Sequence, residues 1–97
     1  MKTAGVGIIG GGLMGREMAS AFARWCALTD VAIKPDLVAV ADLVEPVREW
    51  FRQIPSCRQI TADYKELLAN PAVDVVYVAV PHPLHEKLYI DVLDAGK

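Results

Sequence analysis

The sequence predicts an α/β fold, a doubly wound parallel sheet with strand order 3-2-1-4, and three observations lead to it. Short apolar runs typical of strands alternate along the chain with segments whose apolar residues repeat at helical spacing. The runs are continuously apolar, as expected of strands that helices cover on both faces. Six of the seven glycines lie between Gly5 and Gly15, where the first run leads into the first helix. Strands and helices at these intervals specify βαβ units with right-handed crossovers.

The first half of the chain contains two predicted strands and two predicted helices. Residues 5–9 form the first strand, and a helix face follows at spacing i, i+4, i+7, i+8, i+11, made of Met14, Met18, Ala21, Phe22 and Trp25. A break at residues 34–36 precedes the second strand, "LVAVA", residues 37–41. Pro46 opens the second helix and Pro55 closes it. The apolar face of that helix comprises Val47, Trp50, Phe51 and Ile54.

The second half repeats the alternation. A weak third strand is expected around residues 58–61, and Asp63 with Glu66 has the spacing of a capping box for a short helix. The clearest strand is "VDVVYVAV", residues 73–80, because it is rich in β-branched side chains. Gly96 is placed to end the last helix in a left-handed conformation. The face of that helix is expected to comprise Leu84, Leu88 and Val92.

Composition excludes several classes of protein. The 97 residues make one domain at most, and twelve acidic against ten basic residues leave no positive surface of the kind that nucleic acids or anionic membranes require. No apolar run approaches the ~20 residues of a membrane span, and residues 1–15 lack a signal-peptide pattern. Cys26 and Cys57 fit neither a disulfide framework nor a metal half-site. We therefore expect a cytoplasmic protein without a metal centre.

The residues from Gly10 to Gly15 fit the pattern G-x-G-x-x-G between a strand and a helix. In that context Gly10 would permit a tight turn, Gly12 would let a pyrophosphate approach the backbone, and Gly15 would let helix and strand pack closely. The first helical residues, Leu13 and Met14, would offer unpaired N–H groups to the phosphates. Glycine-rich turns also occur in sheets that bind other ligands or none, but the strand and helix on either side favour a dinucleotide.

Asp42 ends the second strand, where dinucleotide-binding folds place an acid that accepts hydrogen bonds from the adenosine ribose. The alternative makes Asp42 the N-cap of the next helix, with Glu45 completing a capping box. Pro46 argues against this, because it prefers the first helical position and disfavours helical geometry at Glu45. A carboxylate here would repel a 2′-phosphate, and Leu43 and Val44 supply no cation, so we expect NAD rather than NADP.

Several segments, in order, resemble the Gfo/Idh/MocA family of oxidoreductases: "VGIIGGGLMG", "VAVAD", "LLANPAVDVVYVAVP", the P-x-x-x-H spacing of Pro81 and His85, and "DAGK". The resemblance covers essentially the whole chain and implies an incomplete Rossmann domain over residues 1–97. It implies that Asp42 holds the ribose and that the motif glycines hold the pyrophosphate. It also implies that the nicotinamide half is lined by Val80, Pro81, His82 and His85. His82 departs from the asparagine common in the family.

The resemblance implies hydride transfer between nicotinamide C4 and a carbinol carbon of a sugar, cyclitol or related polyol. A family member would continue beyond Lys97 into a fifth strand, a Glu-Lys-Pro motif whose lysine lies at the nicotinamide, and a substrate domain. We therefore assign no catalytic residue and expect this chain alone to be inactive. We also expect the strand over residues 73–80 to pair with another copy in a homo-oligomer. A non-catalytic dinucleotide-sensing or regulatory module is the alternative.

Overall fold

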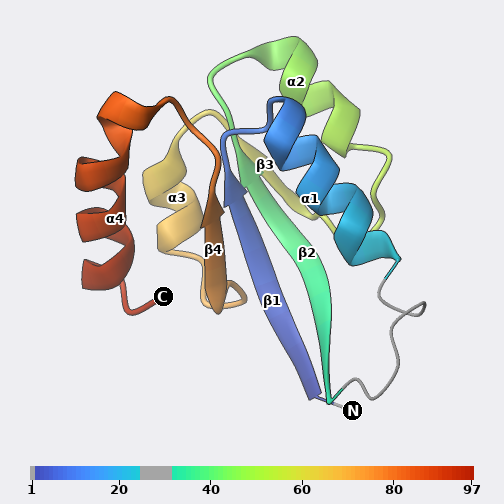
Figure 1. Cartoon of the computed structure of the whole chain (residues 1–97). Coiled ribbons are helices and arrows are strands. Elements are labelled where there is room, and N and C mark those ends of the chain that lie inside the picture. The colour runs from blue at the N-terminus through green and yellow to red at the C-terminus, as the bar shows by residue number, and fades with distance from the viewer. Residues whose placement is uncertain (1, 25–31) are drawn as a thin grey trace.

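The computed structural model describes residues 2–24 and 32–97, with the side chain of His82 excepted. They form a four-stranded parallel sheet in the order β3-β2-β1-β4 with helices on both faces (Figure 1). The predicted fold class and strand order are thus confirmed. In chain order the elements are β1 (Lys2–Ile9), α1 (Leu13–Ala23), β2 (Ile33–Ala41), α2 (Glu45–Phe51), β3 (Gln59–Thr61), α3 (Tyr64–Leu68), β4 (Val75–Val78), the 3-10 turn η2 (His82–Leu84) and α4 (His85–Asp94).

The central strands are longer than the sequence predicts. β1 begins at Lys2, which pairs with Ile33, so β2 runs through the break that was predicted at residues 34–36. Pro35 is tolerated there because β3 pairs with β2 only from Ala39 onwards, and the first half of β2 therefore has β1 as its one neighbour. In contrast, β4 is shorter than predicted and covers four residues. All four strands are parallel, so their carboxyl ends meet at one edge of the sheet.

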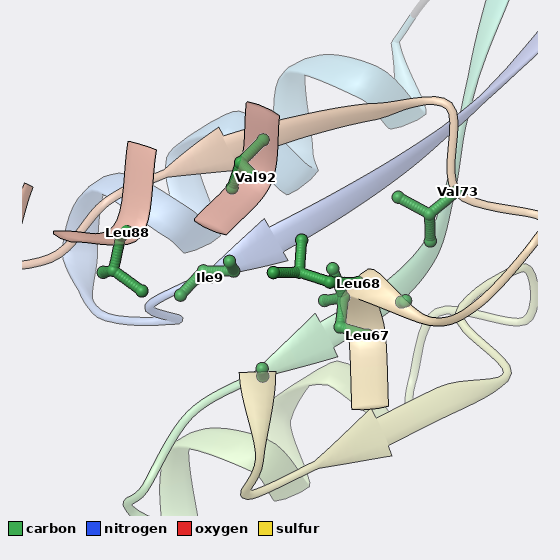
Figure 2. Close-up of a cluster of buried hydrophobic side chains, with 8 residues drawn as sticks. Ile9, Leu67, Leu68, Val73, Leu88 and Val92 are labelled. Carbon is green, nitrogen blue, oxygen red and sulfur yellow. The ribbon is translucent and has the colours of Figure 1, made fainter. Parts of the chain in front are cut away.

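Two apolar clusters hold the helices onto the sheet, one on each face. Helices α3 and α4 pack on one face through the cluster in Figure 2, whose labelled members are Ile9, Leu67, Leu68, Val73, Leu88 and Val92. Helices α1 and α2 cover the opposite face, and the buried residues there are Ile8, Ala19, Leu37, Val40, Phe51 and Cys57. The predicted face of α2 is present, because Phe51 is fully buried and its partly buried neighbours in this cluster include Val47, Trp50 and Ile54.

The face that α1 turns to the sheet differs from the prediction. Its buried residues are Gly15 and Ala19, whereas Met14 is 60% exposed and Ala21 is also exposed. The prediction gave weight to large apolar side chains, but α1 lies so close to the sheet that only small residues fit the contact. Met18 and Phe22 are half-buried at its margins, and Trp25 lies outside the described residues. In α4 the buried face is Leu88 and Val92, while Leu84 belongs to η2 and is half exposed.

The helix ends follow the predicted chemistry in part. Asp63 caps α3 and accepts a hydrogen bond from the Lys65 amide (2.9 Å). The capping box is incomplete, because the Glu66 carboxylate accepts instead from the Thr61 hydroxyl (2.6 Å). Helix α2 begins at Glu45, one residue before Pro46, contrary to the prediction. Gly96 ends α4 with φ +79°, which confirms the left-handed cap.

Candidate functional site

The first turn at the carboxyl edge of the sheet is closed by Gly10. Its φ is +93°, a value that side chains other than glycine rarely adopt. Its amide donates to the carbonyl of Ala41 at the end of β2 (2.8 Å). A Cβ at this position would collide with the carbonyl oxygen of Ala79, just beyond β4. Gly10 thus holds the ends of three strands together.

Gly12 and Gly15 have different surroundings, and each matches the geometry that its predicted role requires. A Cβ on Gly12 would meet nothing within 4 Å, so the backbone at the start of α1 borders open space. A Cβ on Gly15 would collide with the Gly10 carbonyl oxygen and lie 3.3 Å from Ile8 Cγ2. Gly15 therefore sets the close approach of α1 to β1. The pyrophosphate contact at Gly12 stays a prediction.

Gly11 is a residue of this turn to which the sequence argument gave no role. A Cβ there would lie 2.6 Å from Phe51 Cε2 and 2.9 Å from Val47 Cγ1. Its amide donates to the Asp42 carboxylate (2.7 Å). The sequence indicated a role for Gly11 because three glycines occur in a row here, whereas the motif requires glycine only at the first and third of these positions. Gly11 therefore lets the turn lie against α2 and face Asp42.

Asp42 is the polar centre of the site, and both carboxylate oxygens already accept from the backbone. Oδ2 accepts from the Gly11 amide and Oδ1 from the Val44 amide, at 2.7 and 2.8 Å. Asp42 is not the N-cap of α2, because Val44 occupies that position. Each oxygen retains lone-pair capacity for a further donor. The ribose assignment stays a prediction, but the carboxylate that would perform it is held rigidly.

A cation lies closer to Asp42 than the sequence argument allowed. Arg48 Nη1 donates to the Asp42 carbonyl oxygen at 2.8 Å. The expectation that no cation lies near Asp42 rested on Leu43 and Val44, the two residues that follow it directly. Because α2 starts at Glu45, its first turn brings Arg48, six positions after Asp42, back to the end of β2.

A cavity of about 590 Å³ opens at this edge of the sheet. The predicted site residues that line it are Gly10, Gly12, Asp42, Val80 and Pro81. The wall is otherwise mostly apolar, and the basic residue that lines it is Lys87 on α4. An apolar cleft with a few fixed polar groups is the usual form of a site for a small organic ligand.

Four of the predicted site residues lie outside this cavity, namely Leu13, Met14, Gly15 and His85. Leu13 and Met14 are 67% and 60% exposed on the first turn of α1, next to Gly12. The His85 imidazole Nε2 lies 2.7 Å from the Val80 carbonyl oxygen and ties the start of α4 to the residues that follow β4. The side chain of His82 is not among those described. The assignment of these residues to a cofactor stays a prediction.

Residues that follow β3, the end of η2 and the inner side of α4 were not predicted as site residues. They contribute Ala62, Tyr64, Leu84, Lys87 and Leu88 to the cavity, and the loop after β2 contributes Leu43 and Val44. The Tyr64 hydroxyl donates to the Asp91 carboxylate (2.6 Å), which joins α3 to α4. This hydrogen bond, with burial and the charges of Asp91 and Asp63, raises the pKa of Tyr64. The sequence could have indicated these lining residues, because the loops that contact ligands follow the strand ends in such sheets.

Other features of the described residues point to no second chemistry. Among residues 2–24 and 32–97, no group of three or more His, Cys, Asp or Glu could hold a metal ion. Within the same ranges, no helix is long and apolar enough to cross a membrane. Burial raises the pKa of the Cys57 thiol to about 11, so Cys57 stays protonated at neutral pH. Cys26 lies outside the described residues.

A parallel sheet of order 3-2-1-4, a glycine turn at a helix start and a carboxylate at the end of β2 define a dinucleotide-binding domain of the Rossmann class. Residues 4–97 match the family model described as oxidoreductase family, NAD-binding Rossmann fold, the GFO_IDH_MocA family. The chain belongs to this family. The resemblance predicted from the sequence motifs is thereby confirmed.

Similar proteins include sugar and cyclitol dehydrogenases. Inositol 2-dehydrogenase 1 of Mycolicibacterium vanbaalenii is 33% identical over 97 residues, which are 100% of this chain and 26% of that protein. D-xylose 1-dehydrogenase (NADP(+)) of Hypocrea jecorina is 36% identical over 69 residues, 67% of this chain and 18% of that protein. A structure of levoglucosan dehydrogenase with NADH and L-sorbose has a TM-score of 0.88 at 28% identity and covers 100% of this chain and 26% of its own. The chain spans about a quarter of the length of most relatives it matches.

Proposed function

We propose that residues 1–97 are the dinucleotide-binding part of an NAD-dependent oxidoreductase acting on a sugar, cyclitol or related polyol. One observation carries this proposal: Asp42 and Gly12, whose backbone is unobstructed, border the same apolar cavity. A ribose diol and a pyrophosphate are adjacent groups of NAD, and these are the two groups that such residues recognise. The dehydrogenases among the relatives support the substrate class.

The roles proposed for the chain's own residues are to bind and orient. The backbone of Gly12 and the first amides of α1 donate to the pyrophosphate, whose charge the positive end of the helix favours. The free lone pairs of Asp42 accept from the ribose hydroxyls. Bound NAD supplies the chemistry, because nicotinamide C4 takes up or returns the hydride. We assign no catalytic residue to these 97 residues.

Pro81 is proposed to contact the cofactor beside Asp42. It lines the same cavity as Leu43 and Val44, which follow Asp42 in the chain. This arrangement supports a contact with the adenosine side, in addition to the nicotinamide side that the family resemblance implies. Val80, His82 and His85 retain their proposed place towards the nicotinamide. Leu84 of η2 and Leu88 of α4 supply apolar surface for a base or a ring.

Calorimetric titration of the chain tests the proposal and its cofactor preference. We expect NAD to bind at least tenfold more tightly than NADP, a difference of about 1.4 kcal/mol. Asp42→Asn should weaken NAD binding and narrow this ratio, because it removes the charge but keeps one oxygen for the amides of Gly11 or Val44. Asp94→Asn, at the exposed end of α4, is the control and should change neither affinity. Equal or tighter binding of NADP by the unmodified chain would contradict the preference. Binding of NAD by a protein that oxidises no polyol in any context would favour the sensing module.

We also propose that the chain forms a cytoplasmic homo-oligomer through β4. In the described sheet β4 pairs only with β1, and Val75 is 53% exposed on this edge. An apolar edge without lysine or proline favours pairing with a second copy.

Light scattering across a dilution series should therefore show concentration-dependent association, and Val75→Lys should shift it towards the monomer. Leu93→Lys, which replaces a 71% exposed residue of α4, is the matched control. A monomer at every concentration would refute the edge contact.

A further inference from the structure

The guanidinium of Arg48 is held at the end of β2 without a carboxylate partner among the described residues. Nη1 donates to the Asp42 carbonyl oxygen at 2.8 Å, and the side chain is half-buried. Arg52, the C-cap residue of α2, instead pairs with Glu49 at 2.6 Å and is exposed. Arg48 therefore uses one of its five N–H donors on a neutral acceptor. Its charge and its remaining donors are not committed to an ion pair.

Asp42 separates this guanidinium from the cavity. Asp42 lines the cavity and its carbonyl oxygen accepts from Arg48, which is not a lining residue. A ribose bound by the Asp42 carboxylate would thus lie near the Arg48 guanidinium, because that guanidinium contacts the backbone carbonyl oxygen of the same residue. The basic residue among those that line the cavity is Lys87, from α4. Two other charged groups are close in sequence: Glu45, exposed at the first position of α2, and Glu49, which pairs with Arg52.

We propose that Arg48 determines how far this site tolerates a phosphate on the ribose 2′-hydroxyl. This inference rests on the proposed function and extends it, since it names the residue that works against Asp42 in cofactor choice. A guanidinium can release a carbonyl acceptor and bind a phosphate through two parallel N–H donors. The carboxylates of Asp42 and Glu45 oppose a 2′-phosphate, and Arg48 offsets part of that repulsion. The ratio of NAD affinity to NADP affinity is consequently smaller than Asp42 alone would produce.

The test compares NAD and NADP binding by calorimetry at two salt concentrations. In the unmodified chain and in Asp42→Asn, adding Arg48→Gln should weaken NADP binding at least tenfold and change NAD binding less than twofold. The salt dependence of NADP binding should also decrease, because one ion contact is lost. Arg48→Lys should restore part of the NADP affinity. Arg52→Gln, at the C-cap of the same helix, is the matched control and should leave both affinities unchanged.

The outcomes separate this inference from the proposed function. Failure of the unmodified chain to bind NAD would overturn the proposed function, and this inference with it. If NAD binds but Arg48→Gln weakens both cofactors equally, Arg48 merely holds the loop and this inference alone is wrong. A selective loss of NADP in Lys87→Gln instead of Arg48→Gln would overturn it too. Thermal unfolding of each variant shows whether a loss of affinity reflects a loss of fold.

Discussion

Replacement of Gly12 by valine is expected to lower the affinity for NAD about 100-fold, or about 2.7 kcal/mol. Gly12 lies at the start of α1 and on the wall of the cavity, and a side chain at this position would project into open space. A pyrophosphate bound by the first amides of α1 must lie in that space, so a branched side chain would exclude it. The effect concerns the ligand, because no atom beyond the adjacent residues of the chain lies within 4 Å of a Cβ at this position.

Stability should change little in the same variant, which makes the two effects separable. Gly12 is the N-cap of α1 with φ −65°, a value open to all residues, and valine is a poorer cap than glycine by about 1 kcal/mol at most. Calorimetric titration and thermal unfolding measure affinity and stability on one sample. Ala21→Val places the same side chain on an exposed position of α1 and should preserve both. Unchanged NAD binding in Gly12→Val would mean that the pyrophosphate does not lie at this turn.

The glycine turn and the strand order were predictable from the sequence because both depend on local patterns. The tight turn at Gly10 needs a residue without a Cβ, and the pattern places one there. Strand order followed from alternating βαβ units, which leave few topologies to choose from. Asp42 was predictable in the same way, as an acid at the end of a strand.

What the sequence left undetermined depends on how segments approach one another in space. Hydropathy favoured Met14 for the buried face of α1, but the close contact between α1 and β1 selects Gly15. Arg48 contacts Asp42 because of where α2 begins. The preference of Pro46 for the first helical position predicted that start one residue too late. Residues of α4 such as Lys87 reach the cavity only because β4 lies beside β1.

The largest loss of stability is expected from substitution of Gly5, a glycine in the middle of β1 and away from the site. A Cβ on Gly5 would collide with the carbonyl oxygen of Ala72 and lie 3.0 Å from its carbonyl carbon. The backbone cannot easily move away, because two hydrogen bonds hold Gly5 to Asp74. The Gly5 amide donates to the Asp74 carboxylate at 2.8 Å, and the Asp74 amide donates to the Gly5 carbonyl oxygen at 2.7 Å.

We therefore expect Gly5→Ala to lower the free energy of unfolding by about 3 kcal/mol, at the upper end of overpacking effects. For a domain of this size that corresponds to a fall in Tm of roughly 10 to 20 °C. Gly7→Ala is the matched comparison on the same strand. Its Cβ would meet side-chain atoms, Leu67 Cδ2 at 2.9 Å and Val73 Cγ1 at 3.1 Å, which can shift, so its loss should be about 1 kcal/mol. Because Gly5 does not line the cavity, the fraction of Gly5→Ala that remains folded should bind NAD with unchanged affinity. A loss in Gly5→Ala no greater than in Gly7→Ala would show that the segment around Ala72 yields, and that the contact between β1 and this segment is not rigid.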